Sequence, residues 1–161
     1  MKTVLVIGAN RGIGLELIRT FVDNGWRTIG STRPRTLREN DPSVSEIIKI
    51  DYEREDTIIE AAKTLCDTDV KLDVLANCAA DPWSGFKLCP YHLSAGNGGK
   101  IINIFPGSAS IGDPDHDGES VSYRMAKAAV NSETKTLAIN FKTARIPVTT
   151  TVIDPGSSKP D

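Results

Sequence analysis

Val4-Leu5-Val6-Ile7-Gly8-Ala9-Asn10-Arg11-Gly12-Ile13-Gly14 is the stretch that decides the fold of this 161-residue chain. A run of leucine and β-branched residues stops at a glycine, two more glycines follow at spacings of four and two, and an amphipathic segment begins at once. This order predicts a strand, a tight turn and a helix. Glycines let a backbone approach a phosphate closely, and the helix N-terminus offers free N–H groups to an anion. The stretch therefore favours a nucleotide-binding turn over a purely structural one.

Composition limits the class of protein. Residues 1–161 suit a single domain with a substantial core. A formal net charge of -2 without a basic block argues against a nucleic-acid partner, and no apolar run approaches the roughly 20 residues that cross a bilayer. The sequence runs from Met1 straight into a strand, so we expect no signal peptide. Three cysteines without metal-type spacing indicate reduced thiols, no metal site and a cytoplasmic protein.

Strand and helix patterns alternate along the first half of the chain. The alternation predicts a parallel sheet with helices on both faces. Further strands are expected at 26–32, 45–50 and 72–77, with Gly25 as the left-handed cap of the first helix. Four residues of that helix share one face: Leu17, Ile18, Phe21 and Val22. The next helix, over 56–66, is expected to bury Ile58, Ile59, Ala62 and Leu65.

The alternation weakens from Cys78 to Lys100, where little helical pattern is left. A fifth strand is expected at 100–105, a long helix at 123–143 and a sixth strand at 147–153. The fold class is therefore α/β, a Rossmann-type doubly wound parallel sheet of about six strands in the order 3-2-1-4-5-6. The helices between strands four and five are largely missing from this prediction.

The tip of the second expected strand bears on the cofactor. In a dinucleotide-binding fold this tip meets the adenosine ribose, where an acid suits a 2′-hydroxyl and an arginine suits a 2′-phosphate. The chain has Arg33 there and no acid. Arg33 therefore favours NADP over NAD, although a solvated loop arginine remains the alternative.

Tyr123 and Lys127 lie one helical turn apart on the same face of the last expected helix. The pKa of a phenol must fall by about 3 units for it to exchange protons at neutral pH, which needs roughly 4 kcal/mol. A cation about 5 Å away supplies roughly 3 kcal/mol at an effective dielectric constant of about 20. The pair can therefore act in acid–base catalysis if the site is partly dry. A solvated helix face is the alternative.

With these residues the chain resembles the short-chain dehydrogenase/reductase family, and within it the C-factor type of carbonyl reductases. The resemblance covers nearly the whole chain and rests on five blocks in the family's order. They are Gly8-Ala-Asn-Arg-Gly12-Ile-Gly14, Asp51, Asp73-Val-Leu-Ala-Asn77-Cys-Ala-Ala80, Tyr123-x-x-x-Lys127 and Pro155-Gly156.

The resemblance implies a role for each block. Tyr123 would exchange a proton with a carbonyl or alcohol oxygen, Lys127 would bind the nicotinamide ribose, and a hydride would pass between nicotinamide and the carbonyl carbon. The implied cofactor-binding residues are Gly8, Asn10, Arg11, Gly12, Ile13, Gly14, Arg33, Asp51, Tyr52, Asn77, Ala79, Lys127, Pro155 and Gly156.

The chain departs from the family in three ways. Pro106 stands where the family has its catalytic serine, and Ser108 or Ser110 could replace it. The segment before the fifth strand is about half the family's length, and the chain ends soon after Gly156, without the family's substrate-binding helices. The sequence is thus that of a member shortened internally and at its C-terminus. Apolar surface left uncovered by that shortening would favour a homodimer.

Three hypotheses follow. The first is an NADP-dependent oxidoreductase acting on a small carbonyl or alcohol. The second is a shortened member with a non-redox activity on a small molecule, namely a cyclase, isomerase or dehydratase. The third is a non-catalytic nucleotide-binding or interaction protein.

Overall fold

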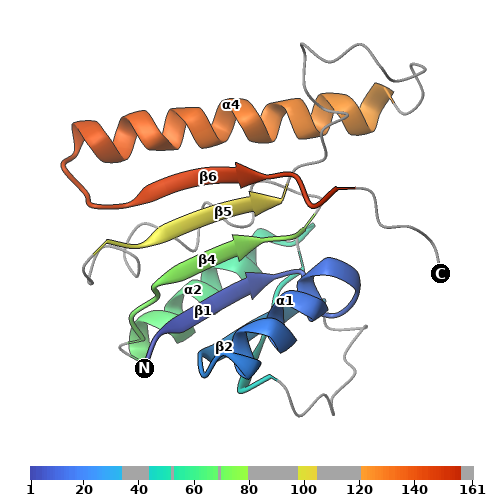
Figure 1. Ribbon diagram of the computed structural model, residues 1–161, viewed down its shortest axis with the longest axis vertical. Helices are drawn as coiled ribbons and strands as arrows, with labels where there is room; N and C mark the ends of the chain where they lie inside the picture. Colours follow the sequence, from blue (N-terminus) through green and yellow to red (C-terminus); the bar gives the residue numbers. More distant parts are fainter. Residues whose placement is uncertain (34–43, 52, 69, 80–97, 105–120, 157–161) are drawn as a thin grey trace.

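The computed structural model describes residues 1–33, 44–51, 53–68, 70–79, 98–104 and 121–156, excluding the side chains of residues 122 and 123. Within these ranges a parallel sheet of six strands carries three helices (Figure 1). In chain order the elements are β1 (Thr3–Ile7), α1 (Gly12–Asp23), β2 (Arg27–Thr32), β3 (Glu46–Lys49), α2 (Glu55–Asp67), β4 (Val74–Asn77), β5 (Lys100–Ile104), α4 (Val121–Thr143) and β6 (Thr149–Ile153).

The strands lie in the order β3-β2-β1-β4-β5-β6, and every neighbouring pair is parallel. Val4 of β1 is level with Thr28 of β2 on one side and with Val74 of β4 on the other. The α/β class and the strand order predicted from the sequence are confirmed. The chain order reverses between β1 and β4, and parallel sheets bind ligands at the carboxyl ends of the strands beside such a point.

The sheet is packed on both faces. On one face, alternate residues of the central strands pack with α2 and α4 in the larger apolar cluster, which contains Leu5, Ile7, Leu65 and Leu137. On the other face, Val4 and Val6 pack with α1 in a smaller cluster. Because β1 is apolar from Val4 to Ile7 and lies between these clusters, its five residues, including Thr3, are all buried. A strand buried on both faces is typical of parallel α/β sheets.

Helix α1 agrees with its predicted packing, and α2 differs in one position. Ile18 is buried, and its predicted companions on that face pack against the smaller cluster. Gly25 has the left-handed φ of 74° expected after α1. In α2 the prediction for Ile59 is wrong, because this side chain is 45% exposed and Ala61 is buried instead. Helical spacing places Ala61, not Ile59, on the face shared by Ile58, Ala62 and Leu65.

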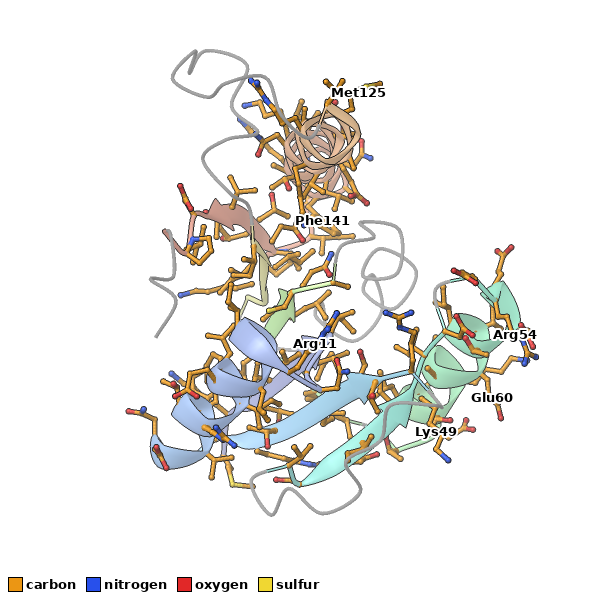
Figure 2. The ribbon with its side chains drawn as sticks, turned by 90° about the vertical axis from the view of Figure 1, so that its right-hand side faces the viewer. Arg11, Lys49, Arg54, Glu60, Met125 and Phe141 are labelled. Carbon is orange, nitrogen blue, oxygen red and sulfur yellow. The ribbon has the colours of Figure 1, made fainter. Side chains whose placement is uncertain are left out.

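Helix α4 lies along β6 (Figure 1). Figure 2 shows Phe141 pointing from α4 toward the sheet and Met125 pointing away from it. The face of α4 toward the sheet carries five buried residues at spacings of three and four: Lys127, Val130, Thr134, Leu137 and Phe141. The helix itself was predicted at 123–143 and is observed at Val121–Thr143. The segments that include 80–97 and 105–120 lie outside the described residues, so the loss of helix before β5 stays a prediction.

Candidate functional site

The glycine turn after β1 is fixed on the end of β2. The backbone N–H of Gly8 donates to Oγ of Ser31 at 3.1 Å, and the N–H of Ala9 donates to the carbonyl oxygen of Ser31 at 2.9 Å. Gly8 has a φ of 81°, which favours glycine. The turn therefore reverses the chain directly above the carboxyl ends of β1 and β2.

Helix α1 begins next to this turn without a side-chain cap. Arg11 is its N-cap residue in an extended conformation, and no acid stands in the first turn. The first N–H groups of a helix have no partner within the helix and form a partial positive charge. A Cβ on Gly14 would lie 2.2 Å from the carbonyl oxygen of Gly8. Only glycine thus lets α1 start so close to the turn, with its N–H groups toward the carboxyl edge of the sheet.

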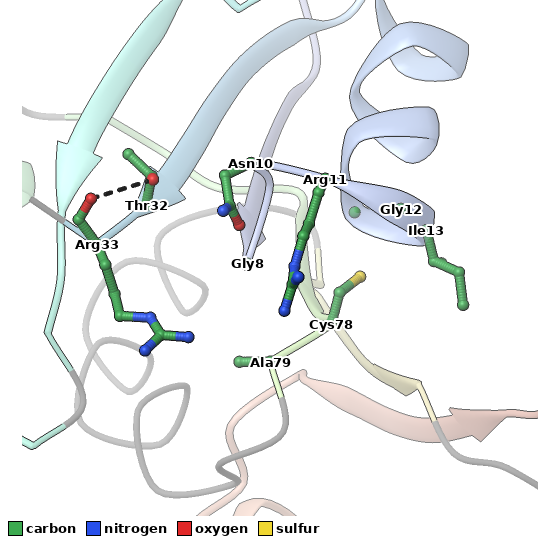
Figure 3. A pocket seen from close by; sticks show the side chains of 10 residues that line it. Gly8, Asn10, Arg11, Gly12, Ile13, Thr32, Arg33, Cys78 and Ala79 are labelled. Carbon is green, nitrogen blue, oxygen red and sulfur yellow. Dashed lines mark hydrogen bonds between the residues drawn. The ribbon is translucent and has the colours of Figure 1, made fainter. Parts of the chain in front are cut away.

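A cavity of about 600 Å³ lies at this edge. Figure 3 shows the side chains of Arg11 and Arg33 reaching into it from two sides. Nothing lies within 4 Å of the position that a Cβ on Gly12 would take, so the space over Gly12 is open. The cavity is lined by Gly8, Asn10, Arg11, Gly12, Ile13, Gly14, Thr32, Arg33, Cys78 and Ala79.

This arrangement suits a phosphorylated ligand. Free backbone N–H groups and the dipole of α1 attract an anion, and guanidinium groups bind phosphate oxygens in pairs. The open space over Gly12 admits a ligand against the backbone itself. A dinucleotide therefore fits the residues present, with a pyrophosphate at the helix N-terminus.

The end of β4 forms another wall of the cavity. The buried Asn77 side chain accepts a hydrogen bond from the Ala79 N–H at 3.2 Å, which holds the chain in its turn beyond β4. Cys78 follows Asn77 and lines the cavity. Burial raises the pKa of the Cys78 thiol from 9.0 to about 12, and the nearby charge of Lys127 opposes this shift. The thiol is therefore neutral at physiological pH.

Helix α4 places Lys127 beside this wall. Lys127 is 6% exposed and faces the sheet. Desolvation lowers the pKa of its ammonium group, while the charge of the Cys78 thiolate would raise it. Tyr123 lies one turn earlier in the same helix. The structure thus brings the predicted helix of Tyr123 and Lys127 to the same end of the sheet as the glycine turn.

The predicted site residues divide into three groups. Those that line the cavity are Gly8, Asn10, Arg11, Gly12, Ile13, Gly14, Arg33 and Ala79. Those that the structure describes elsewhere are Asp51, Asn77, Lys127, Pro155, Gly156 and the backbone of Tyr123. Tyr52, Ser108 and Ser110 lie outside the described residues.

Sequence reasoning missed two cavity residues, Thr32 and Cys78. Thr32 ends β2 just before Arg33, and its hydroxyl donates to the Arg33 carbonyl oxygen at 3.3 Å (Figure 3). Cys78 stands between two predicted residues, Asn77 and Ala79. Thr32 and Cys78 are each next in sequence to a predicted site residue, and this was the signal that could have identified them.

The described part of the chain lacks two features that would indicate other classes of site. It contains no helix long and apolar enough to span a membrane. It also contains no group of three or more His, Cys, Asp or Glu side chains that could hold a metal ion.

Solved structures with similar folds include two with NADP. One is a short-chain dehydrogenase/reductase from Burkholderia multivorans with bound NADP, with a TM-score of 0.77 and 24% identity, covering 96% of this chain and 79% of that one. The other is a complex of Pseudomonas aeruginosa RhlG with NADP, with a TM-score of 0.77 and 22% identity, covering 98% of this chain and 72% of that one. At these identities the likeness establishes the fold.

The sequence comparisons identify the family. An uncharacterized oxidoreductase of Bacillus subtilis is 26% identical over 187 aligned residues, which cover 97% of this chain and 66% of the relative. The chain thus spans just under two thirds of that relative's length. The family model described as short chain dehydrogenase matches residues 2–89, more than half of the 161 residues. The chain belongs to the short chain dehydrogenase family.

Proposed function

We propose that the protein is an NADP-dependent oxidoreductase that transfers a hydride between nicotinamide and a small carbonyl or alcohol substrate. One observation carries the proposal. The cavity combines the glycine turn, the start of α1 and the side chains of Arg11 and Arg33 in one place (Figure 3). Membership of the short chain dehydrogenase family supports the oxidoreductase class.

The cofactor would be held mainly by backbone and by arginine. The N–H groups at the start of α1 would bind the pyrophosphate over the open space at Gly12. Arg33, with Arg11 opposite, would bind the 2′-phosphate that distinguishes NADP from NAD. Two similar folds that contain NADP support this preference. When bound, the nicotinamide would donate or accept the hydride.

The remaining cofactor contacts follow the family resemblance. Asp51 and Tyr52 would lie at the adenine, Asn77 and Ala79 along the adenosine, and Pro155-Gly156 near the nicotinamide. Asn77 would act through the backbone turn that it holds, since its side chain accepts from the Ala79 N–H.

Tyr123 would exchange the proton with the substrate oxygen, and Lys127 would hold the ribose and favour the phenolate. Burial of Lys127 supports this, because an ammonium group in a partly dry site acts more strongly on a neighbouring phenol. Ser108 or Ser110 would supply the hydroxyl that Pro106 lacks. No observation on the site favours a cyclase, isomerase, dehydratase or non-catalytic protein over this function.

The wider assignments belong to the same proposal. The protein would be a shortened member of the C-factor branch, cytoplasmic and homodimeric. The alignment of 187 residues with the Bacillus subtilis relative exceeds the 161 residues of this chain, which supports an internal shortening. Large exposed apolar side chains of α4 and β6 support self-association: Val121, Met125, Ile139, Val152 and Ile153.

Calorimetric titration tests the cofactor assignment. The wild-type protein should bind NADPH at least ten times more tightly than NADH. Arg33→Ala should weaken NADPH binding by about 10- to 100-fold, since a charged hydrogen bond contributes about 1.5–3 kcal/mol, and should leave NADH binding unchanged. Arg19→Ala, an exposed change in α1 outside the cavity, is the matched control. Equal binding of both cofactors would reject the NADP assignment.

Turnover of a carbonyl panel tests the chemistry. Tyr123→Phe should abolish NADPH oxidation while NADPH still binds, because the change removes only the phenol hydroxyl that exchanges the proton. Unchanged turnover in this variant would contradict the proposed role of Tyr123.

A further inference from the structure

Helix α4 contacts the sheet through a stripe that is partly polar. Val130, Leu137 and Phe141 give this stripe its apolar contacts. Apolar contact is non-directional, so these residues favour burial without fixing how far the helix slides or turns. Hydrogen bonds depend on distance and angle, and they can fix both. The polar residues of the stripe therefore decide the exact placement of α4.

Thr134 joins α4 to β5. The side-chain amide of Asn103, in β5, donates to Oγ1 of Thr134 at 2.7 Å, and this hydroxyl donates in turn to the Val130 carbonyl oxygen at 2.7 Å. Asn103 is 5% exposed and Thr134 is 7% exposed, so water competes little for these bonds. A hydroxyl that accepts one bond and donates another has its orientation fixed.

The same residue joins α4 to β6. Oγ1 of Thr150, in β6, donates to the main-chain carbonyl oxygen of Thr134 at 3.0 Å. Thr134 thus receives a hydrogen bond from each of the two strands beneath α4, one at its side chain and one at its backbone. Two bonds to different strands resist both sliding and rotation of the helix.

The placement of α4 sets the placement of Lys127. Seven residues make almost two full turns, so Lys127 and Thr134 share the face toward the sheet. A slip of one residue would move the helix by about 1.5 Å and turn it by about 100°. Such a change would carry Lys127 away from Cys78 and the cavity wall, and Tyr123 would move with it.

We propose that Asn103, Thr134 and Thr150 are positioning residues, which fix α4 on β5 and β6 and thereby set where Lys127 and Tyr123 stand relative to the cofactor cavity. The inference rests on the proposed function for its catalytic meaning. The three residues touch neither cofactor nor substrate in this assignment, and they act through the helix.

Thr134→Val is the main test, because valine keeps the shape of threonine and removes the hydroxyl. The kcat for carbonyl reduction should fall by about 10- to 100-fold, the size expected when reacting groups are misplaced by about 1 Å. The KM for the carbonyl should stay unchanged, and the Kd for NADPH should rise by no more than about tenfold, because the cavity lining is untouched and only the single ribose contact of Lys127 is lost. The pH profile should move to higher pH, because Lys127 leaves its partly dry position and then favours the Tyr123 phenolate less. Thr150→Val should lower kcat in the same direction but less.

Three controls separate positioning from loss of stability. Thr134→Ser keeps the hydroxyl and should restore most of the kcat. Thr136→Val removes an equivalent bond, from an exposed hydroxyl to the Ser132 carbonyl oxygen at 2.9 Å on the same helix, and should have no effect. Phe141→Leu loosens the apolar contact of α4 and should lower the unfolding free energy while preserving the kcat of the folded protein.

The inference is overturned if Thr134→Val keeps the wild-type kcat, or if Phe141→Leu lowers kcat equally. Amine labelling with acetic anhydride tests the placement of α4 through the accessibility of Lys127. It needs no substrate, so its result remains valid if the proposed function fails. Lys127 should be labelled more slowly than exposed Lys135 in the wild type and in Thr136→Val, and at a similar rate to Lys135 in Thr134→Val. Slow labelling of Lys127 in Thr134→Val would also overturn the inference.

Discussion

The centre of the sheet and its C-terminal edge are covered differently. Every residue of β1 is buried, because α1 packs on one face of the strand and α2 on the other. In β6 only Thr150 is half-buried, while Val152 and Ile153 are 37% and 44% exposed. Among the described residues, α4 covers one face of β6 and no helix covers the other (Figures 1 and 2).

This difference separates two ways of building a site. The glycine turn and α1 are fixed by burial on both faces and by backbone contacts that leave no room for a side chain. Helix α4 has apolar contact with the sheet on one side and depends on hydrogen bonds at Thr134 for its alignment. The glycine-turn half of the site should therefore be disrupted by steric change. The α4 half, which carries the proposed catalytic residues Tyr123 and Lys127, should be disrupted by loss of single polar groups.

The largest loss of stability is expected from Gly14→Ala, in the glycine-turn half of the site. The new Cβ would lie 2.2 Å from the Gly8 carbonyl oxygen, so α1 must move away from the turn. We expect the unfolding free energy measured in urea to fall by about 3 kcal/mol or more, and NADPH affinity to be lost.

Gly25→Ala is the control for this change. Gly25 has a φ of 74°, and nothing lies within 4 Å of its Cβ position. Gly25→Ala should lower the unfolding free energy only by the backbone strain of about 1–2 kcal/mol, and NADPH affinity should persist. Equal losses of stability in the two variants would contradict the steric account of the turn.

Local signals in the sequence predicted the glycine-turn half of the site most completely. The run from Val4 to Gly14 carries its own strand, turn and helix signals, so its structure and its cavity contacts could be predicted from neighbouring residues. Arg33 was predicted at the cofactor site because the tip of the second strand in this fold lies beside the adenosine ribose. The misassignment of Ile59 arose from choosing apolar residues by type, where helical spacing selects Ala61.

The features that could not be predicted depend on contacts between residues that are distant in the sequence. Asn103 and Thr134 are 31 residues apart, and no local pattern pairs them. Cys78 meets Lys127 only when α4 is packed on the sheet, so their opposing pKa shifts could not be predicted from spacing. The features of the α4 half that the sequence did not predict are thus those that the placement of the helix on the sheet creates.

An intermediate effect is expected where the two halves meet, at Cys78. Burial raises the pKa of this thiol from 9.0 to about 12. Between these values the folded protein keeps a proton that the unfolded chain loses, so the stabilisation is complete below pH 9 and declines as the pH rises. The contribution to the unfolding free energy should fall by up to about 1.4 kcal/mol per pH unit. Cys78→Ala should remove this decline in urea unfolding measured between pH 8.5 and 11.

Lys127 sharpens the same experiment because its sign is opposite. Its folded-state pKa is lowered from 10.5, so just below pH 10.5 the unfolded chain holds more protons and the Lys127 contribution rises with pH. In Cys78→Ala this rise should become visible, and Lys127→Met in addition should flatten it. Cys66→Ala, an exposed thiol on α2, should behave as the wild type. Identical slopes in wild type and Cys78→Ala would contradict a raised pKa for the partly buried thiol at the cavity wall.

The smallest effect is expected at the ends of the two helices, α1 and α4. Trp26 N–H donates to the Phe21 carbonyl oxygen at 3.0 Å, and Ile146 N–H donates to the Phe141 carbonyl oxygen at 2.9 Å, so both helices end in the same turn. The left-handed residue is Gly25 in the first case and Arg145, with a φ of 56°, in the second.

Arg145→Gly should therefore raise the unfolding free energy by about 0.5–1 kcal/mol, because glycine adopts this backbone conformation without the strain that a side chain brings. Urea unfolding at constant pH measures the gain. Arg145→Ala keeps a Cβ and the strain while removing the charge, so it should show no gain. If Arg145→Ala were stabilised as much as Arg145→Gly, loss of the guanidinium would be the cause, and the end of α4 would not differ from that of α1 in backbone strain.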